Sequence, residues 1–101
     1  MDELPVVSKR IREARIRSKL SQERLGVMAG IDEFSASARM NQYERGRHTP
    51  NYQLVNRLAE VLGLPTAYFY AEDDQLAELL VIYGRLTVRA RKRLIDLAGE
   101  L

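Results

Sequence analysis

The apolar residues of this chain recur at helical spacing almost throughout, and the strict apolar–polar alternation expected of strands is absent. Near the start, Val7, Ile11 and Ala14 fall at i, i+4 and i+7 and form one apolar stripe. Ser21 is suited to cap a second helix, and Gly30 is suited to end it. The pattern therefore predicts an all-α fold built from short helices.

The middle of the chain predicts two further helices. Either Ser35 or Ser37 is expected to cap a third helix, which ends near Gly46. A fourth is expected to begin at residues 49–51, where a proline fits the first helical turn, and to end at Gly63. Its inward stripe is Leu54, Leu58, Ala59 and Leu62.

After a short aromatic turn at residues 67–70, the last thirty residues predict a helical hairpin. Its two apolar stripes are Leu76, Leu79, Leu80 and Tyr83, and then Leu94, Leu97, Ala98 and Leu101. Neither helix could bury its stripe alone, so each must pack on something. We expect residues 72–101 to extend the part formed by residues 1–71 within one compact unit.

Composition excludes several classes of function. The 101 residues suit a single domain, and without cysteine there is neither a disulfide nor a thiolate metal ligand. No apolar run is long enough for a membrane span. No nucleophile with a base partner is evident, and Asp73 and Asp74 are adjacent, so they would not share a helical face. We expect neither an enzyme nor a metal or cofactor site.

Charge is segregated along the chain, although the net charge is only +2. Seven basic and two acidic residues lie between Lys9 and Arg24, whereas Glu60 to Glu78 holds five acids and no base. Five bases and no acid then follow within residues 85–93. This distribution suggests a polyanionic partner near the N-terminal part, but charge taken alone fits solvated helix faces better.

Four short sequence elements turn the helical pattern into a family resemblance. Residues 20–25 read LSQERL and residues 29–31 read AGI; residues 43–46 read YERG, and Pro50 precedes LAEVLG at residues 58–63. In this order and spacing they resemble the Xre-type regulators, the family of the Cro-like and lambda-repressor-like helix-turn-helix domains. The resemblance covers roughly residues 5–70.

The resemblance implies a lambda-repressor-like domain of four to five short helices, here followed by the C-terminal hairpin. Its recognition helix, the helix that enters the DNA major groove, is expected near residues 36–45. The resemblance also implies a largely buried ion pair between Arg15 and Glu44. Gly26 stands where the family usually has alanine, and its small size would let the second helix approach the recognition helix closely.

The chain departs from the family in one place. Gly30 and Glu44 are fourteen positions apart, roughly four more than is common in the family. The extra residues lie around Asp32 to Ser35, either in the turn or at the start of the third helix. We expect Phe34 to pack over an enlarged turn, and the insertion leaves open which residue enters the groove first.

Counting back from Glu44 gives the expected DNA contacts, with Met40 and Tyr43 facing inward. The residues expected to read bases are Ser37, Ala38, Arg39, Asn41 and Gln42. Those expected to contact phosphates are Gln22, Arg45, Arg47, His48 and Asn51, together with Arg10 and Arg17 of the basic first helix.

The function expected from the resemblance is a cytoplasmic, sequence-specific regulator that binds double-stranded DNA. A single module contacts few bases, so we expect a homodimeric repressor on an inverted repeat, with an interface at the hairpin and at Leu64 and residues 68–70. These aromatic residues could instead belong to the core. An antitoxin-like or adaptor protein whose hairpin holds a protein partner is the main alternative, and a scaffold that no longer reads DNA is a weaker one.

Overall fold

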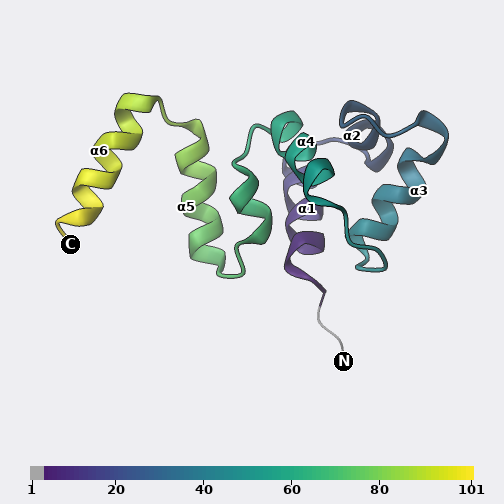
Figure 1. Cartoon of the computed structure of the whole chain (residues 1–101), viewed down its shortest axis with the longest axis horizontal. Helices are drawn as coiled ribbons and strands as arrows, with labels where there is room; N and C mark the ends of the chain where they lie inside the picture. Colours follow the sequence, from purple (N-terminus) through teal and green to yellow (C-terminus); the bar gives the residue numbers. More distant parts are fainter. Residues whose placement is uncertain (1–3) are drawn as a thin grey trace.

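The computed structural model describes residues 4–101 and is all-helical over that range (Figure 1), as predicted. Six α-helices and one 3-10 helix follow in the order α1 (Val6–Arg17), α2 (Gln22–Met28), α3 (Glu33–Glu44), α4 (Tyr52–Leu62), η1 (Thr66–Tyr70), α5 (Asp74–Arg85) and α6 (Val88–Gly99).

Most helix ends lie where the sequence predicted them. Ser21 caps α2, as predicted, and Asn51 and Thr87 cap α4 and α6; each accepts a hydrogen bond from the backbone N–H three residues on, at 2.8–3.1 Å. Pro50 precedes the cap of α4 instead of lying in its first turn. Gly30 and Gly63 follow α2 and α4 with φ of +94° and +67°, a left-handed conformation that glycine adopts without a steric cost.

The start of α3 differs from the prediction. Asp32, rather than Ser35 or Ser37, caps this helix, and its Oδ2 accepts the N–H of Phe34 at 3.1 Å. Aspartate caps a helix as well as serine does, and the earlier start adds a hydrogen-bonded turn. The extra residues therefore lengthen α3 at its N-terminus instead of enlarging the turn.

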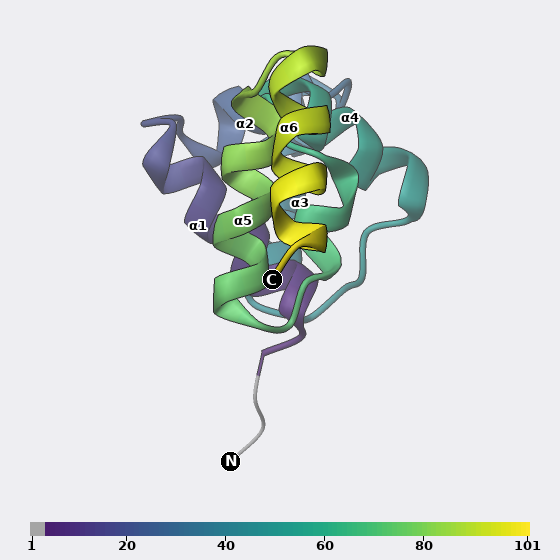
Figure 2. The same cartoon turned by 90° about the vertical axis from the view of Figure 1, so that its left-hand side faces the viewer.

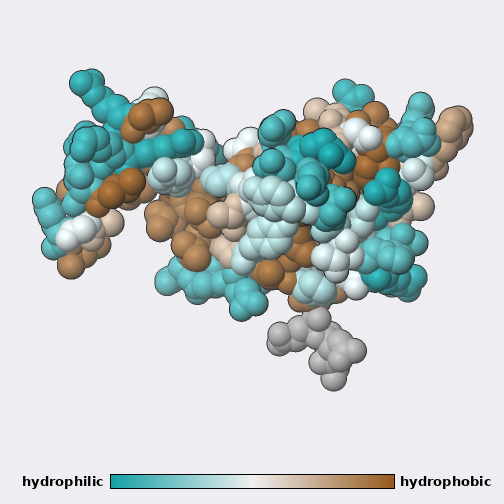
Figure 3. Space-filling model, in the orientation of Figure 1, coloured by the Kyte–Doolittle hydropathy of each residue, from teal (hydrophilic) through white to brown (hydrophobic). Residues whose placement is uncertain are grey.

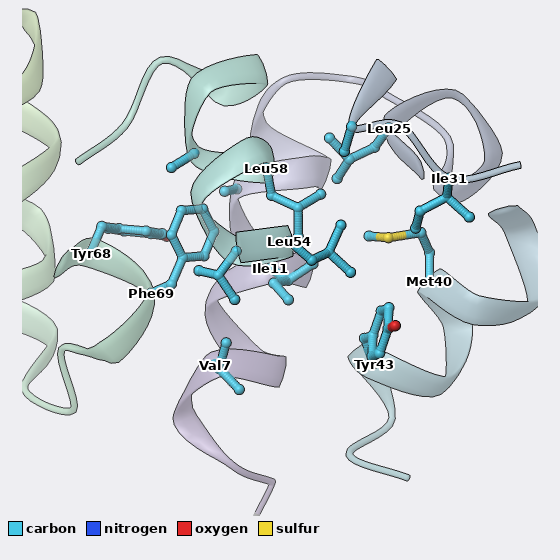
Figure 4. Close-up of a cluster of buried hydrophobic side chains, with 14 of the residues drawn as sticks. Val7, Ile11, Leu25, Ile31, Met40, Tyr43, Leu54, Leu58, Tyr68 and Phe69 are labelled. Atoms are coloured by element: carbon cyan, nitrogen blue, oxygen red, sulfur yellow. The ribbon is translucent and has the colours of Figure 1, made fainter. Parts of the chain in front are cut away.

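The hydrophobic core lies between α1, α2, α3, α4 and η1 (Figure 4). Each of these elements contributes at least one side chain that is fully buried or nearly so: Ile11, Leu25, Met40, Leu58 and Phe69. Burial of one such side chain stabilises the fold by about 1.5–3 kcal/mol. This core fixes α3 against the rest of the domain.

The aromatic turn belongs to the core. Two of the four residues expected there at a dimer interface, Tyr68 and Phe69, are therefore wrong. Tyr68 and Phe69 are buried and meet edge to face, with ring centroids 5.1 Å apart. Tyr70 is exposed and Leu64 is half-buried. A 3-10 turn points its side chains in three directions, and the two that face α1 and α4 fill the core.

Helix α5 packs on η1 through a different face from the one that the sequence suggested. Its buried residues are Ala77 and Val81, whereas Leu76 and Leu79 of the predicted stripe are exposed. Small residues explain this choice, because a Cβ on Gly84 would lie 2.9 Å from a ring carbon of Pro65. Ala77 and Gly84 let α5 approach the domain closely. Leu80 of the predicted stripe packs partly against the core, and Leu76 and Leu79 stay exposed.

Helix α6 has no buried residue and lies beyond α5, at the opposite end of the long axis from α3 (Figures 1 and 2). Arg91 joins it to α5: its Nε donates to the carbonyl of Tyr83 at 3.0 Å, and its guanidinium stacks over the Tyr83 ring. Hydrophobic side chains are exposed over both α5 and α6 (Figure 3).

Candidate nucleic-acid interface

A polar groove of about 1020 Å³ runs between α1, the start of α2 and the outer side of α3. Side chains from all three helices line it: Arg12 and Arg15 from α1, Gln22 and Glu23 from α2, and Ser37, Asn41 and Glu44 from α3, with Arg45 just beyond. The groove is open to solvent along its length. Donors and acceptors on its walls can therefore meet a ligand that lies across the surface.

Arg15 and Glu44, the pair expected from the sequence, lie at the base of this groove. Arg15 Nε donates to Glu44 Oε2 at 2.6 Å and its Nη2 donates to Glu44 Oε1 at 3.0 Å. Gln22 Nε2 donates to Glu44 Oε1 at 3.2 Å and reaches Asn41 Oδ1 at 3.4 Å. This network ties α1, α2 and α3 together and fixes the orientation of the recognition helix.

The structure brings the expected base-reading residues onto the open side of α3. Met40 and Tyr43 point inward, as predicted, and Ser37, Ala38 and Gln42 are exposed. Asn41 is half-buried because Gln22 covers part of it. Ser37 and Asn41 line the groove itself.

Arg39 lies at one edge of this face. At about 100° per residue, it is turned roughly 160° from Asn41 around the helix axis. Its Nη2 donates to the Tyr43 hydroxyl at 2.7 Å, and the guanidinium lies 5.8 Å from the centre of that ring. Arg39 is thereby held to the flank of α3 rather than to the groove.

Most of the residues expected to contact phosphates lie in two places, around the loop between α3 and α4 and at the end of α1. Arg45, Arg47 and His48 are exposed in the loop after α3, where Gly46 turns the chain with φ of +73°. Asn51 uses its Oδ1 to cap α4, which leaves its amide N–H groups free to donate. Arg17 is exposed at the end of α1, 4.0 Å from Glu13.

The side chain of Arg10 is buried, so the prediction that it contacts DNA phosphates is wrong. Its side chain is 1% exposed, and its Nε donates to the carbonyl of Ala71 at 2.9 Å. Its Nη2 donates to Asp74 at 3.0 Å, and Lys9 binds the same carboxylate. The hydrogen bonds from Lys9 and Arg10 hold the pKa of Asp74 below its usual value. Arg10 therefore joins α1 to the start of α5.

Arg12 is a candidate that the sequence reasoning did not single out. It is exposed and lines the groove beside Arg15. The signal was in the spacing: Arg12 precedes Arg15 by three residues, so both lie on the same face of α1. Since Arg15 is the residue that binds Glu44 of α3, its face of α1 is the one that borders the groove.

Among residues 4–101, no helix is long and apolar enough to cross a membrane. Over the same range, no group of three or more acidic or histidine side chains is placed to hold a metal ion.

Comparisons with known proteins agree with this geometry. A family model described as a helix-turn-helix domain matches residues 7–68. The crystal structure of the transcriptional regulator BswR superposes with a TM-score of 0.85, at 49% sequence identity and over 93% of each chain. No relative is detected among curated proteins. The chain therefore belongs to the helix-turn-helix family of transcription regulators.

Proposed function

We propose that this protein is a sequence-specific repressor that binds an inverted repeat in double-stranded DNA as a homodimer. The observation that carries the proposal is the outer face of α3, where exposed polar side chains border an open groove and the inner face is locked into the core. A rigid helix with such a face fits the major groove.

The outer face of α3 offers several forms of direct readout. Gln42 and Asn41 can each present a donor and an acceptor to adenine, and Ala38 can contact a thymine methyl. Ser37 can donate or accept at either kind of base pair. Arg39 would have to release the Tyr43 hydroxyl before its guanidinium could bind guanine.

Phosphate contacts would set the register of this helix in the groove. Arg45, Arg47 and His48 stand at one end of α3, and Arg12 supplies positive charge from α1. Arg17 lines a separate hollow between α1 and α5. Gln22 already holds Glu44 and Asn41 through its amide, so a phosphate contact from this amide requires it to leave those partners.

Dimerisation is supported by the C-terminal helices. Several apolar side chains of α6 are more than half exposed, and two leucines of α5 are also open to solvent: Val88, Ile95 and Leu97, and then Leu76 and Leu79. A second copy would bring matching apolar faces.

We assign the role of a repressor because a dimer bound across a promoter would block polymerase without needing an activating contact. The decisive test is selection of bound duplexes from a random pool at about 150 mM salt, which suppresses purely electrostatic binding. An enriched inverted repeat supports the proposal. Binding that disappears as salt rises, without enrichment, contradicts it.

A second candidate rests on the same open face of α6. In an adaptor or antitoxin-like protein, this face would hold a different protein while the helix-turn-helix domain binds DNA. The mass of the pure protein in solution separates the two, measured by sedimentation equilibrium. A dimer favours the homodimeric regulator, and a monomer at tens of micromolar favours the partner-dependent protein.

A further inference from the structure

Phe34 is an apolar side chain in an unexpected place. It lies in the first turn of α3 and is 97% exposed, so it does not cover the turn before this helix as expected. The only other phenylalanine of the chain, Phe69, is fully buried. A single exposed apolar residue needs no explanation by itself. The position of Phe34 on the helix is what carries the argument.

Helical geometry places Phe34 on the base-facing side of α3. At about 100° per residue, it lies roughly 40° from Ala38 and 20° from Asn41 around the helix axis. Asn41 lines the groove, and the inward residues Met40 and Tyr43 lie on the other side. Phe34 thus continues the stripe that faces DNA, about 6 Å farther along the axis than Ala38.

The extra turn of α3 is the reason that Phe34 reaches this position. Because Asp32 caps the helix, residues 33–36 are helical and extend the recognition helix at its N-terminal end. Had the added residues formed a loop, Phe34 would not share the register of Ala38 and Asn41. The departure from the family in sequence therefore becomes a longer reading surface in structure.

Charge argues against a role for this end of α3 at the sugar–phosphate backbone. Asp32 and Glu33 are both exposed beside Phe34, and carboxylates repel phosphate oxygens. Phe34 itself has no polar group to donate. In the floor of the major groove, the C5-methyl of thymine is the apolar group that such a side chain can meet.

Building on the proposed operator binding, we propose that Phe34 reads a thymine C5-methyl at one position of each half-site, beyond the bases met by Ala38 and Asn41. The contact is purely apolar, so it adds discrimination at that one base pair and leaves the readout of the other positions unchanged. The affinity that it supplies corresponds to burying one methyl group against an aromatic ring.

The test compares the bases selected from a random pool by the wild-type protein and by Phe34→Ala. We expect the variant to lose one thymine preference per half-site and to keep the rest of the inverted repeat. Deoxyuridine at that thymine, which removes only the methyl group, should weaken wild-type binding about 3-fold to 10-fold per half-site. The same deoxyuridine should not further weaken DNA binding by Phe34→Ala, and Phe34→Leu should retain part of the thymine preference.

Deoxyuridine at a thymine outside the half-sites is the matched DNA control and should change nothing. Identical selected sequences for wild type and Phe34→Ala would overturn the role of Phe34. An equal loss of affinity on all duplexes would also overturn it, because this would indicate a contact without sequence preference. If the wild-type protein selects no sequence, the proposed operator binding fails as well, so the two failures are distinguishable.

Discussion

Arg15 and Glu44 meet in a two-bond ion pair that joins the first helix to the recognition helix. The Nε–Oε2 and Nη2–Oε1 distances are 2.6 and 3.0 Å, and Glu44 is 3% exposed. Arg15 also donates to the carbonyl of Leu20 at 2.9 Å, so one guanidinium closes the end of α1 and holds α3.

Removal of Arg15 should therefore destabilise the domain strongly. Arg15→Ala leaves the Glu44 carboxylate buried without its cation, and we expect a loss of about 3–5 kcal/mol in the free energy of unfolding, measured with urea. The exposed pair Lys92–Asp96 is the matched control, and Lys92→Ala should cost less than about 0.5 kcal/mol. Similar losses for both variants would contradict the structural role of the buried pair.

Gly26 sets the distance between α2 and α3. A Cβ at this position would lie 3.0 Å from Ala36 Cβ and 3.0 Å from Met40 Cγ. Alanine gains about 1 kcal/mol in helix propensity, and overpacking costs about 1–3 kcal/mol. We expect Gly26→Ala to lower the free energy of unfolding by about 1 kcal/mol net.

Gly99 is the control for Gly26, because nothing lies within 4 Å of an added Cβ there. Gly99→Ala should leave stability unchanged or raise it slightly. A stabilised Gly26→Ala variant would show that α3 can move away without cost, and its DNA selection would then reveal whether the recognition helix has shifted.

Tyr68 should make the stability of the fold depend on pH in the alkaline range. Burial, together with the hydrogen bond that its hydroxyl donates to Glu13 Oε1 at 2.9 Å, raises the pKa of Tyr68 from 10.0 to about 12. The folded protein holds this proton more tightly than the unfolded chain. The resulting stabilisation is present below pH 10 and is lost as the pH rises from 10 toward 12.

Absorbance of tyrosinate followed against pH should show a late step from Tyr68, near pH 12. Tyr68→Phe should remove this late step and flatten the fall of stability between pH 10 and 12. A late step that persists in Tyr68→Phe would assign it to another tyrosine, such as Tyr70, whose pKa burial also raises.

Arg12 should contribute to DNA affinity without contributing to sequence choice. Arg12→Ala should weaken binding of all duplexes alike and reduce the slope of log K against log salt by about 1. Arg93, exposed on α6 away from the groove, is the control and should leave this slope unchanged. A change in the selected bases with Arg12→Ala would instead place this residue at a base edge.

The exposed face of α6 should control self-association. Leu97 is more than half exposed, and an aspartate there would put a charge into the proposed dimer interface. Leu97→Asp should convert a dimer to a monomer in sedimentation experiments and weaken operator binding. Since α6 has no buried residue, the unfolding of the domain should change little. A dimer that persists in Leu97→Asp would place the interface elsewhere.

The sequence by itself determined the order of the helices, some of their caps and most of the core. Local signals settle these features: Ser21 and Asn51 are good caps, glycine favours a left-handed helix end, and an apolar stripe such as Val7, Ile11 and Ala14 must be buried. The partnership of Arg15 and Glu44 was implied by the family resemblance and is present in the structure, although the extra residues around Asp32 to Ser35 lie between the two.

Tertiary structure decided between alternatives that the local sequence allows equally. Asp32, Ser35 and Ser37 can all cap a helix, and only the packed domain selected Asp32 and turned Phe34 outward. Arg10 is one of many basic residues in sequence, yet the nearby carbonyl of Ala71 and the Asp74 carboxylate draw it inside. An apolar stripe indicates that one face of a helix must be buried. The element that buries this face depends on residues far away in the chain.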